Sequence, residues 1–400
     1  MSLLPVEEAQ ARLLTRAAPL PIEAVSLLAA RGRYLAEPVV ALRDQPWADL
    51  SAMDGYAIRH ADLPGPWRLV GESRAGGTPP TEVLEPGTTL RIFTGAPLPP
   101  GADAVLVQEE AGADGECITL TGDGPGHVGR NVRPRGSDFA TGASLLEDGI
   151  RIGASQIALA AMAGHATLPV RRAPRVAILS TGDELVPVGA PLRPGQIPAS
   201  NDIMLAAMLA AEGAEVIDIG LVPDRLEAVT AAFRAGAEAD IIVSTGGASV
   251  GDHDLVAPGI QAAGGSLDFW KIALRPGKPL MAGQLGDAIV LGLPGNPVSA
   301  FVTATLFLLP LVRQLSGATS PLPPVVTLPS DVPFKPGGVR AEYLRARIES
   351  GRVIDVAGRD SAALRPLAHS NALVLRPIDA PAVEAGGWVK AILLESGCIA

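Results

Sequence analysis

The pattern of apolar and polar residues changes along the chain and divides it into stretches of different structure. Over residues 6–17 the apolar residues recur at the spacing of an amphipathic helix, and residues 22–30 show similar helical character. Over residues 39–138 short apolar runs alternate with glycine and proline turns, which is typical of β-structure. We therefore expect a helical N-terminal segment followed by a β-rich module.

Strands and helices alternate in the middle of the chain. Apolar strands are predicted at 175–179, 216–221, 240–243 and 288–291, and helices at 154–163, from Ser200 to about Ala211, after Asp224 and from Asn296 to about Leu315. Asp224 and Glu227 are spaced as in a capping box, Asn296-Pro297 suits a helix start, and Gly317 suits a helix end. This alternation predicts a doubly wound parallel sheet with helices on both faces.

A proline-rich linker at 318–324 marks a domain boundary. Short strands return after it at 325–328, 343–346 and 372–375, so we expect a small β-barrel or sandwich at the C-terminus. The predicted fold class is α/β plus β, in several domains.

Composition supports a globular chain and limits its partners. Of 400 residues, 48% are hydrophobic and 18% charged, which suits two to four packed domains. The formal net charge of −10 gives no overall attraction for nucleic acid or an anionic membrane, so an anion must be held by local groups. Residues 288–312 carry no charge, but prolines interrupt them, and we interpret them as buried core.

Several reaction types and one location are disfavoured by what the sequence lacks. Cys117 and Cys398 are too far apart in sequence to indicate a cysteine-rich metal site, and the five histidines show no metal-ligand spacing. No nucleophile elbow or Walker lysine is visible, which disfavours covalent nucleophilic catalysis. The N-terminus has acids where a signal peptide needs basic residues, so we expect a cytoplasmic protein.

Two predicted strand ends carry the same tripeptide. Ser180-Thr181-Gly182 precedes Asp183 and Glu184, and Ser244-Thr245-Gly246 precedes Gly247, Ser249 and Asp254. Ligands bind outside the carboxyl ends of parallel strands, where glycine amides and hydroxyls suit phosphate and carboxylates suit Mg²⁺. The alternative is that both tripeptides are ordinary turns.

Two further segments favour an anion. Pro294-Gly295-Asn296-Pro297 opens a helix directly after a strand, which places the positive end of the helix dipole at the same edge of the sheet. The chain has only four lysines, and Lys271 and Lys278 flank Arg275 in one short stretch. Lysine is a compact cation for an oxyanion. Plain helix initiation and a solvated charge run are the alternatives.

The β-rich module contributes weaker candidates. Asp54 lies in a tight glycine turn, Thr94 ends an apolar strand, and Arg133 and Arg135 stand beside Asp138. Each of these features alone is more often structural than functional.

Together, six motifs in order resemble the molybdopterin molybdenumtransferases, the MoeA and gephyrin E-domain family. They are SAMDGYA from Ser51, TGAP from Thr94, STGDEL from Ser180, STGGASVG from Ser244 with Asp254, the segment from Lys271 to Pro279, and GLPGNPVS from Gly292. The resemblance spans nearly the whole chain.

The resemblance implies Mg²⁺-dependent insertion of molybdate into adenylylated molybdopterin, with release of AMP. It also implies a homodimer whose active cleft is shared between subunits, and contacts with the molybdopterin adenylyltransferase and apo-molybdoenzymes. The four-domain subunit it implies would divide into 1–42 packed with 139–172, 43–138, a MogA-like domain at 173–317, and 318–400.

The family's functional positions carry over to particular residues of this chain. The resemblance implies catalytic roles for Asp54, Thr94, Asp138, Glu184, Asp224 and Asp254, with Asp54, Glu184 and Asp254 as metal ligands. It implies cofactor binding by Ser180, Thr181, Gly182, Ser244, Thr245, Gly246, Gly247, Ser249, Lys271, Arg275, Lys278, Pro294, Gly295, Asn296 and Pro297. Arg275 departs from the family, which often has lysine there, so the charge is kept and the geometry changes.

Two other functions fit the same resemblance. One is a non-catalytic scaffold of the gephyrin E-domain type, for which the acids Asp54 and Glu184 would have no chemical use. The other is the related adenylylation step, which the β-rich and C-terminal modules disfavour because the adenylyltransferase resembles the α/β domain alone.

Overall fold

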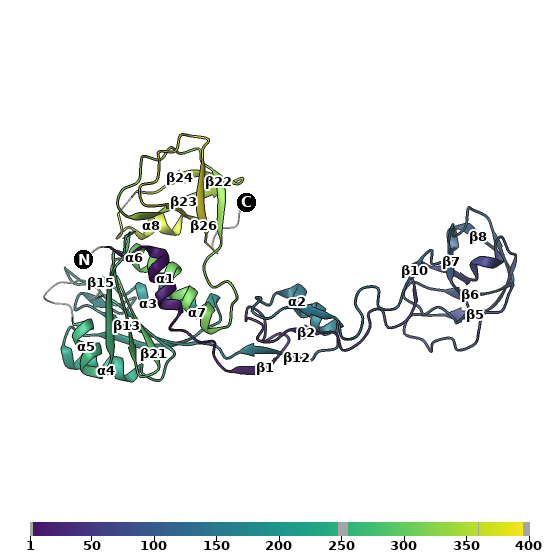
Figure 1. Ribbon diagram of the computed structural model, residues 1–400, viewed down its shortest axis with the longest axis horizontal. Coiled ribbons are helices and arrows are strands. Elements are labelled where there is room, and N and C mark those ends of the chain that lie inside the picture. The colour runs from purple at the N-terminus through teal and green to yellow at the C-terminus, as the bar shows by residue number, and fades with distance from the viewer. Residues whose placement is uncertain (1–2, 247–254, 359, 395–400) are drawn as a thin grey trace.

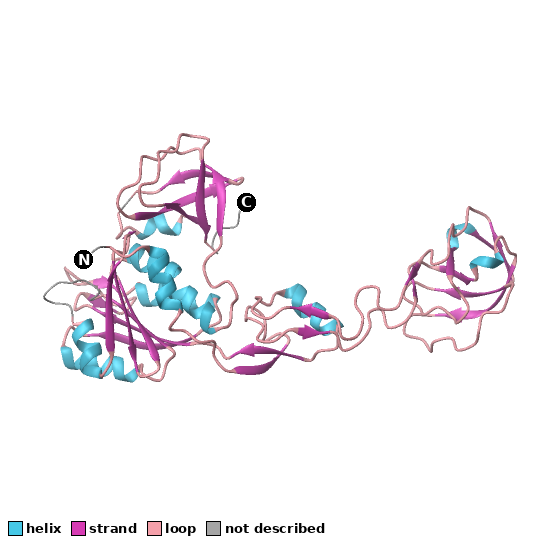
Figure 2. Ribbon diagram, viewed as in Figure 1, coloured by secondary structure: helices cyan, strands magenta, loops and turns pink. Residues whose placement is uncertain are grey.

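The computed structural model describes residues 3–246, 255–358 and 360–394 (Figure 1). The described chain is elongated. A β-rich module lies at one end, a small middle module follows, and the α/β part and the C-terminal sheet lie together at the other end (Figures 1 and 2).

The α/β part contains a six-stranded sheet in the order β16-β13-β17-β21-β20-β18. Its strands are β13 (Arg175–Thr181), β16 (Glu215–Val222), β17 (Ile241–Thr245), β18 (Ser266–Lys271), β20 (Pro279–Leu285) and β21 (Ala288–Leu293). The first four strands in the order are parallel, as predicted, but β20 pairs antiparallel with both β21 and β18. The sheet is therefore mixed, because the short turn at Gly286 joins β20 to β21 as a hairpin, which requires antiparallel strands.

Helices cover both faces of this sheet. Alternate residues of β13 enter different cores: Val176 and Ile178 pack on the side of α3 (Asn201–Ala211), and Ala177 and Leu179 on the side of α4 (Leu226–Ala235) and α5 (Val256–Ala263). The predicted capping box before α4 is wrong. Arg225 is the N-cap residue, no side chain caps the helix, and Asp224 contacts another loop instead.

A 19-residue helix follows β21 and lies in the larger core. It consists of α6 (Pro297–Thr303), the π-helical turn η3 (Ala304–Leu308) and α7 (Leu309–Leu315). Pro310 has no N–H to donate to the carbonyl of Leu306, and the wider turn lies just before it. Gln10 of α1 (Val6–Leu14) donates its Nε2–H to that carbonyl at 2.8 Å.

By length and composition this helix could cross a membrane, and it is the one helix of the described chain that could. Its most apolar window is 78% buried inside the protein. It packs as a core helix, as the sequence predicts for this segment.

The predicted helix at 22–30 is wrong. Ile22–Ser26 is strand β1, which pairs antiparallel with β12 (Thr167–Arg171). The two strands are distant in sequence, so the local pattern carries no sign of the partner that fixes the extended conformation. This ribbon leads to the middle module, where β2 (Val39–Val40), β11 (Ser144–Leu146) and α2 (Ala154–Met162) surround a small core.

The β-rich module holds the candidate Asp54 in the turn between β3 (Leu50–Ser51) and β4 (Gly55–Ile58). Its sheet has the order β7-β4-β6-β5-β9-β8. The other bounds are β5 (Trp67–Ser73), β6 (Thr88–Ile92), β7 (Ala104–Val107), β8 (Ala111–Asp114), β9 (Cys117–Leu120) and β10 (Val132–Arg133), which pairs with β3.

The C-terminal sheet reaches back to the α/β part through one short strand. β19 (Leu274–Arg275) pairs in parallel with β23, and the order is β19-β23-β25-β26-β22 with β24 on β23. Its members are β22 (Val325–Pro329), β23 (Ala341–Glu349), β24 (Arg352–Val356), β25 (Ala372–Arg376) and β26 (Trp388–Leu393), with the short helix α8 at Leu364–Ala368. The C-terminal part is thereby fixed beside the carboxyl ends of the parallel strands.

Candidate functional site

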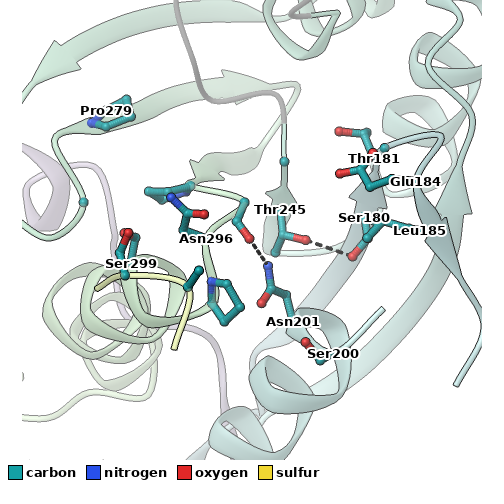
Figure 3. Close-up of a pocket in the computed structure, with 18 of the residues that line it drawn as sticks. Ser180, Thr181, Glu184, Leu185, Ser200, Asn201, Thr245, Pro279, Asn296 and Ser299 are labelled. Atoms are coloured by element: carbon teal, nitrogen blue, oxygen red, sulfur yellow. Dashed lines mark hydrogen bonds between the residues drawn. The ribbon is translucent and has the colours of Figure 1, made fainter. Parts of the chain in front are cut away.

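A cavity of about 930 Å³ opens where β13, β17 and β21 end. Its lining combines the predicted loops with residues of the C-terminal part (Figure 3). The sequence-predicted residues that line it are Ser180, Thr181, Gly182, Glu184, Asp224, Thr245, Gly246, Arg275, Lys278, Pro294, Gly295, Asn296 and Pro297. The structure therefore brings both Ser-Thr-Gly loops, the acids and the helix start to one place.

The two Ser-Thr-Gly loops are joined to each other. The hydroxyls of Ser180 and Thr245, both buried, are 2.9 Å apart and hydrogen-bonded (Figure 3). Gly246 has a φ of +90°, and a Cβ there would lie 2.3 Å from the carbonyl oxygen of Thr181. Glycine at this position permits both the left-handed backbone and the close approach of the two strand ends.

The helix start is fixed from two sides. Asn201 of α3 donates its Nδ2–H to the carbonyl of Gly295 at 2.8 Å (Figure 3), and its buried Oδ1 has no partner among the described residues. The amide of Val298 donates to the carbonyl of Ser361 at 3.1 Å. The loop and the first turn of α6 are thus held rigid at the cavity wall, with the positive end of the helix toward it.

Carboxylates gather on the two loops that follow β13 and β16. The amide of Asp183 donates to Asp224 Oδ2 at 3.3 Å, and the amide of Asp224 donates to Asp183 Oδ1 at 3.1 Å. Burial raises the pKa of Asp224 above its ordinary value, and repulsion from Asp183 and Glu184 adds to the effect. A cation placed here would relieve that repulsion.

The oxygen atoms in this part of the cavity suit a hard cation that is bound partly by the protein and partly by the substrate. In the described ranges no three His, Cys, Asp or Glu residues are grouped as a metal site. Glu184 and Asp224 nevertheless line the same cavity, and Mg²⁺ commonly uses one or two carboxylates, waters and substrate phosphates. These two residues therefore fit Mg²⁺ and not a metal caged by protein alone.

Cationic side chains form a second part of the lining, the cationic wall, and Figure 3 shows Pro279, next to Lys278, across the cavity from Glu184. Arg275 and Lys278 come from the segment between β18 and β20, and Arg340 comes from the start of the C-terminal sheet. Arg275 Nη1 lies 3.4 Å from Glu342 Oε1. Lys271 does not belong to the lining given by the described residues, although it ends β18 in register with the cavity-lining Pro279; its carbonyl accepts the amide of Leu4.

Several lining residues were not predicted. Arg340, Ser361 and Ala362 come from the C-terminal part, and Asn201 and Ser299 from helices. The segment around Ser361 is fixed by Arg345, a buried arginine that donates to the carbonyls of Gly358, Asp360 and Ala363. The sequence gives no local signal for these positions, because a separate domain delivers them. The polar start of α3 at Asn201 is the one sign that could have suggested a role.

Asp54 and Thr94 form a local pair in the β-rich module and do not line the cavity. The amide and the hydroxyl of Thr94 donate to Asp54 Oδ1 at 2.7 and 2.8 Å. The bond from the Thr94 amide lowers the pKa of Asp54, and the Thr94 hydroxyl and the charge of Arg91 lower it further. Asp54 is therefore a half-exposed, ionised carboxylate, and the β-rich module that carries it lies at the opposite end of the chain from the α/β part (Figure 1).

The remaining predicted residues fall into two groups. Ser244 is buried and directly precedes the cavity-lining Thr245. Asp138 is exposed in the loop between β10 and β11, where its amide donates to the carbonyl of Gln45. Gly247, Ser249 and Asp254 lie outside the described residues.

Three family descriptions match the chain in order. Residues 4–164 match the MoeA N-terminal region (domain I and II), residues 177–314 match a probable molybdopterin binding domain, and residues 327–394 match the MoeA C-terminal region (domain IV).

Similar proteins span most of the chain. A molybdopterin molybdenumtransferase of Nostoc sp. is 38% identical over 390 residues, which cover 93% of this chain and 88% of the relative. One of Haemophilus influenzae is 38% identical over 319 residues, covering 79% and 78%. The crystal structure of a molybdopterin biosynthesis moeA protein from Pyrococcus horikoshii superposes with a TM-score of 0.83 at 30% identity and covers 98% of this chain and 99% of that one.

Proposed function

Since the chain belongs to the molybdopterin molybdenumtransferase family, we propose that it inserts molybdate into adenylylated molybdopterin and releases AMP in an Mg²⁺-dependent reaction. The observation that carries the proposal is the cavity beyond β13, β17 and β21. Its lining includes the carboxylates Glu184 and Asp224 (the acidic wall) and the cations Arg275, Lys278 and Arg340 (the cationic wall). Such a division suits a ligand that is anionic and also brings a divalent cation.

The cationic wall would hold the oxyanions. Lys278 supplies a point charge, Arg275 and Arg340 supply planar donors, and the start of α6 supplies the positive end of a helix. The helix start and Arg275 have partners before the ligand binds, so these two groups can stabilise charge that develops when the phosphoanhydride breaks. The two Ser-Thr-Gly loops bring hydroxyls and a glycine amide to the floor between the walls.

The acidic wall would hold Mg²⁺ through Glu184 and Asp224. The metal, when bound, would supply positive charge beside the scissile phosphate. Glu184 and Asp224 would themselves orient the ligand by placing that charge.

We further propose that Asp54 and Thr94 act from the neighbouring subunit of a homodimer. Within one chain their β-rich module lies at the opposite end from the α/β part that contains the cavity (Figure 1), so one subunit could not bring both sets of residues to one ligand without bending. The lowered pKa of Asp54 keeps it ionised, as a metal ligand or a molybdate-orienting group requires.

The test is AMP release from adenylylated molybdopterin by the purified protein, with and without molybdate and Mg²⁺. Glu184→Gln and Asp54→Asn should each lower turnover by at least ~100-fold, the scale of removing one preorganised electrostatic group. Asp331→Asn is the matched control, because Asp331 is an exposed carboxylate paired with Arg352 away from the cavity. Well-folded wild-type protein that releases no AMP would refute the proposal and favour the scaffold.

A further inference from the structure

Arg275 and Glu342 meet where the α/β part joins the C-terminal sheet. They are register partners in the β19–β23 pair, and Arg275 Nη1 lies 3.4 Å from Glu342 Oε1. The side chain of Glu342 is 10% exposed, whereas that of Arg275 is 42% exposed and lines the cavity. A buried acid from one domain therefore contacts a cavity-lining cation from another.

The contact leaves most of the guanidinium available. A guanidinium has five N–H donors in one plane, and in this pair one nitrogen faces Glu342. Without an anchor, a long arginine side chain samples many rotamers, and a ligand must then overcome the loss of that freedom. An anchored guanidinium offers its remaining edge in one orientation, which matches two oxygens of a tetrahedral anion.

We propose that Glu342 is a positioning residue that holds Arg275 in the cavity as a preformed fork for a tetrahedral oxyanion, the chemistry shared by a phosphate group and molybdate. The inference deepens the proposed function and rests on it for the identity of the ligand. The proposal also explains why the residue at position 275 is arginine, since a lysine would provide the charge without the planar pair of donors.

Two effects of Glu342 oppose each other. Its negative charge weakens the attraction of Arg275 for an anion, whereas its anchoring strengthens the bond that forms. Arg275 is well exposed, so solvent screens the first effect. The second effect does not depend on screening. Anchoring is therefore the larger effect, and loss of Glu342 weakens anion binding.

The test is calorimetric titration of the full-length protein with inorganic phosphate and, separately, with molybdate. Glu342→Ala should weaken the affinity for at least one anion roughly tenfold, the scale of one charge-assisted hydrogen bond. Glu342→Gln keeps an oxygen acceptor and should recover most of the affinity. In an Arg275→Ala background, Glu342→Ala should change the affinity no further, because the group that it positions is gone.

Arg376→Ala is the matched control for damage to the sheet. Arg376 is a buried arginine of β25 whose charge also interacts with Glu342, but it donates to the carbonyls of Lys335 and Pro381 and does not line the cavity. It should lower thermal stability and leave both anion affinities unchanged. A loss of affinity equal to that of Glu342→Ala would show that Glu342 acts only through the sheet, and would overturn the proposal.

The two titrations also identify the anion. A loss for phosphate alone assigns the fork to the phosphate of the substrate, and a loss for molybdate alone assigns it to molybdate. Unchanged or tighter binding of both anions by a folded Glu342→Ala protein overturns the proposal, as does the absence of anion binding by the wild-type protein. Anion affinities that respond as expected in a protein that releases no AMP would refute the transferase function and leave this pair intact.

Discussion

Asp224 shows how one residue can be unfavourable for stability and suited to function. Asp224 is largely exposed, but partial desolvation and two neighbouring acids raise its pKa above the ordinary 3.8. A folded-state pKa above the unfolded value means that the folded protein binds the proton more tightly. Stability is therefore lost as pH rises from about 3.8 through the folded pKa, and the cost is fully present at neutral pH.

This linkage gives a prediction for Asp224→Asn. The amide cannot ionise, so the thermal midpoint at neutral pH should rise slightly, since solvent screens an exposed carboxylate, while turnover falls by ~100-fold because a charged group of the acidic wall is lost. The stability gain should disappear below the ordinary pKa of Asp224, where the wild-type side chain is also neutral. Thermal scans at the two pH values check it. A lower midpoint at neutral pH would mean that the carboxylate stabilises the fold.

At the scale of elements, the site depends on how closely two strand ends approach. Gly246 needs a left-handed backbone and also leaves no room for a Cβ beside Thr181. Gly264, at the end of α5, has a similar φ of +98° but open space around its Cβ position. A substitution at either glycine would strain the backbone, but only one at Gly246 would also create a steric contact. Comparing the two therefore distinguishes the two effects.

We predict that Gly246→Ala and Gly264→Ala both destabilise the protein by about 1 kcal/mol through backbone strain, and that Gly246→Ala costs more. Only Gly246→Ala should weaken phosphate binding, because relief of its contact must move the carbonyl of Thr181. Urea unfolding and phosphate titration of both variants are the measurements. Equal losses of stability and unchanged phosphate binding in Gly246→Ala would argue against the tight approach of the two loops.

The sequence predicts an element well when the residues that determine its conformation lie within the element itself. The four parallel strands and the helix from Asn296 were predictable, because each contains its own apolar run and its own ending. Strand β1 was predicted as a helix because its partner β12 is far away in sequence, and the antiparallel strands β18 and β20 were not recognised.

The same limit applies to the candidate site. The loops after β13, β17 and β21 were predictable because parallel strands end at one edge of a sheet. Arg340 and Ser361 were not, since a separate domain places them there through β19 and Arg345. Lys271 was expected near the anion and lies outside the lining of the described residues, although its register partner Pro279 is part of that lining.

At the scale of the whole molecule, the elongated shape explains why the candidate residues fall into two sets. One set surrounds the cavity of the α/β part, and the other, Asp54 and Thr94, lies in the β-rich module at the opposite end (Figure 1). A two-fold symmetric dimer could bring the module of each subunit to the cavity of its partner, because the same pair of surfaces would meet twice. We propose that the active site is shared between two subunits in this way.

Complementation between two inactive variants tests whether the active site is shared between subunits. Asp54→Asn and Glu184→Gln proteins, each nearly inactive alone, are mixed, exchanged between dimers and assayed for AMP release. With shared sites, each mixed dimer has one site with both substitutions and one with neither, so random exchange should restore roughly a quarter of wild-type activity by the statistics of a two-fold dimer. Mixed dimers that form and stay inactive would place Asp54 and Glu184 in the same site of one subunit and contradict the account.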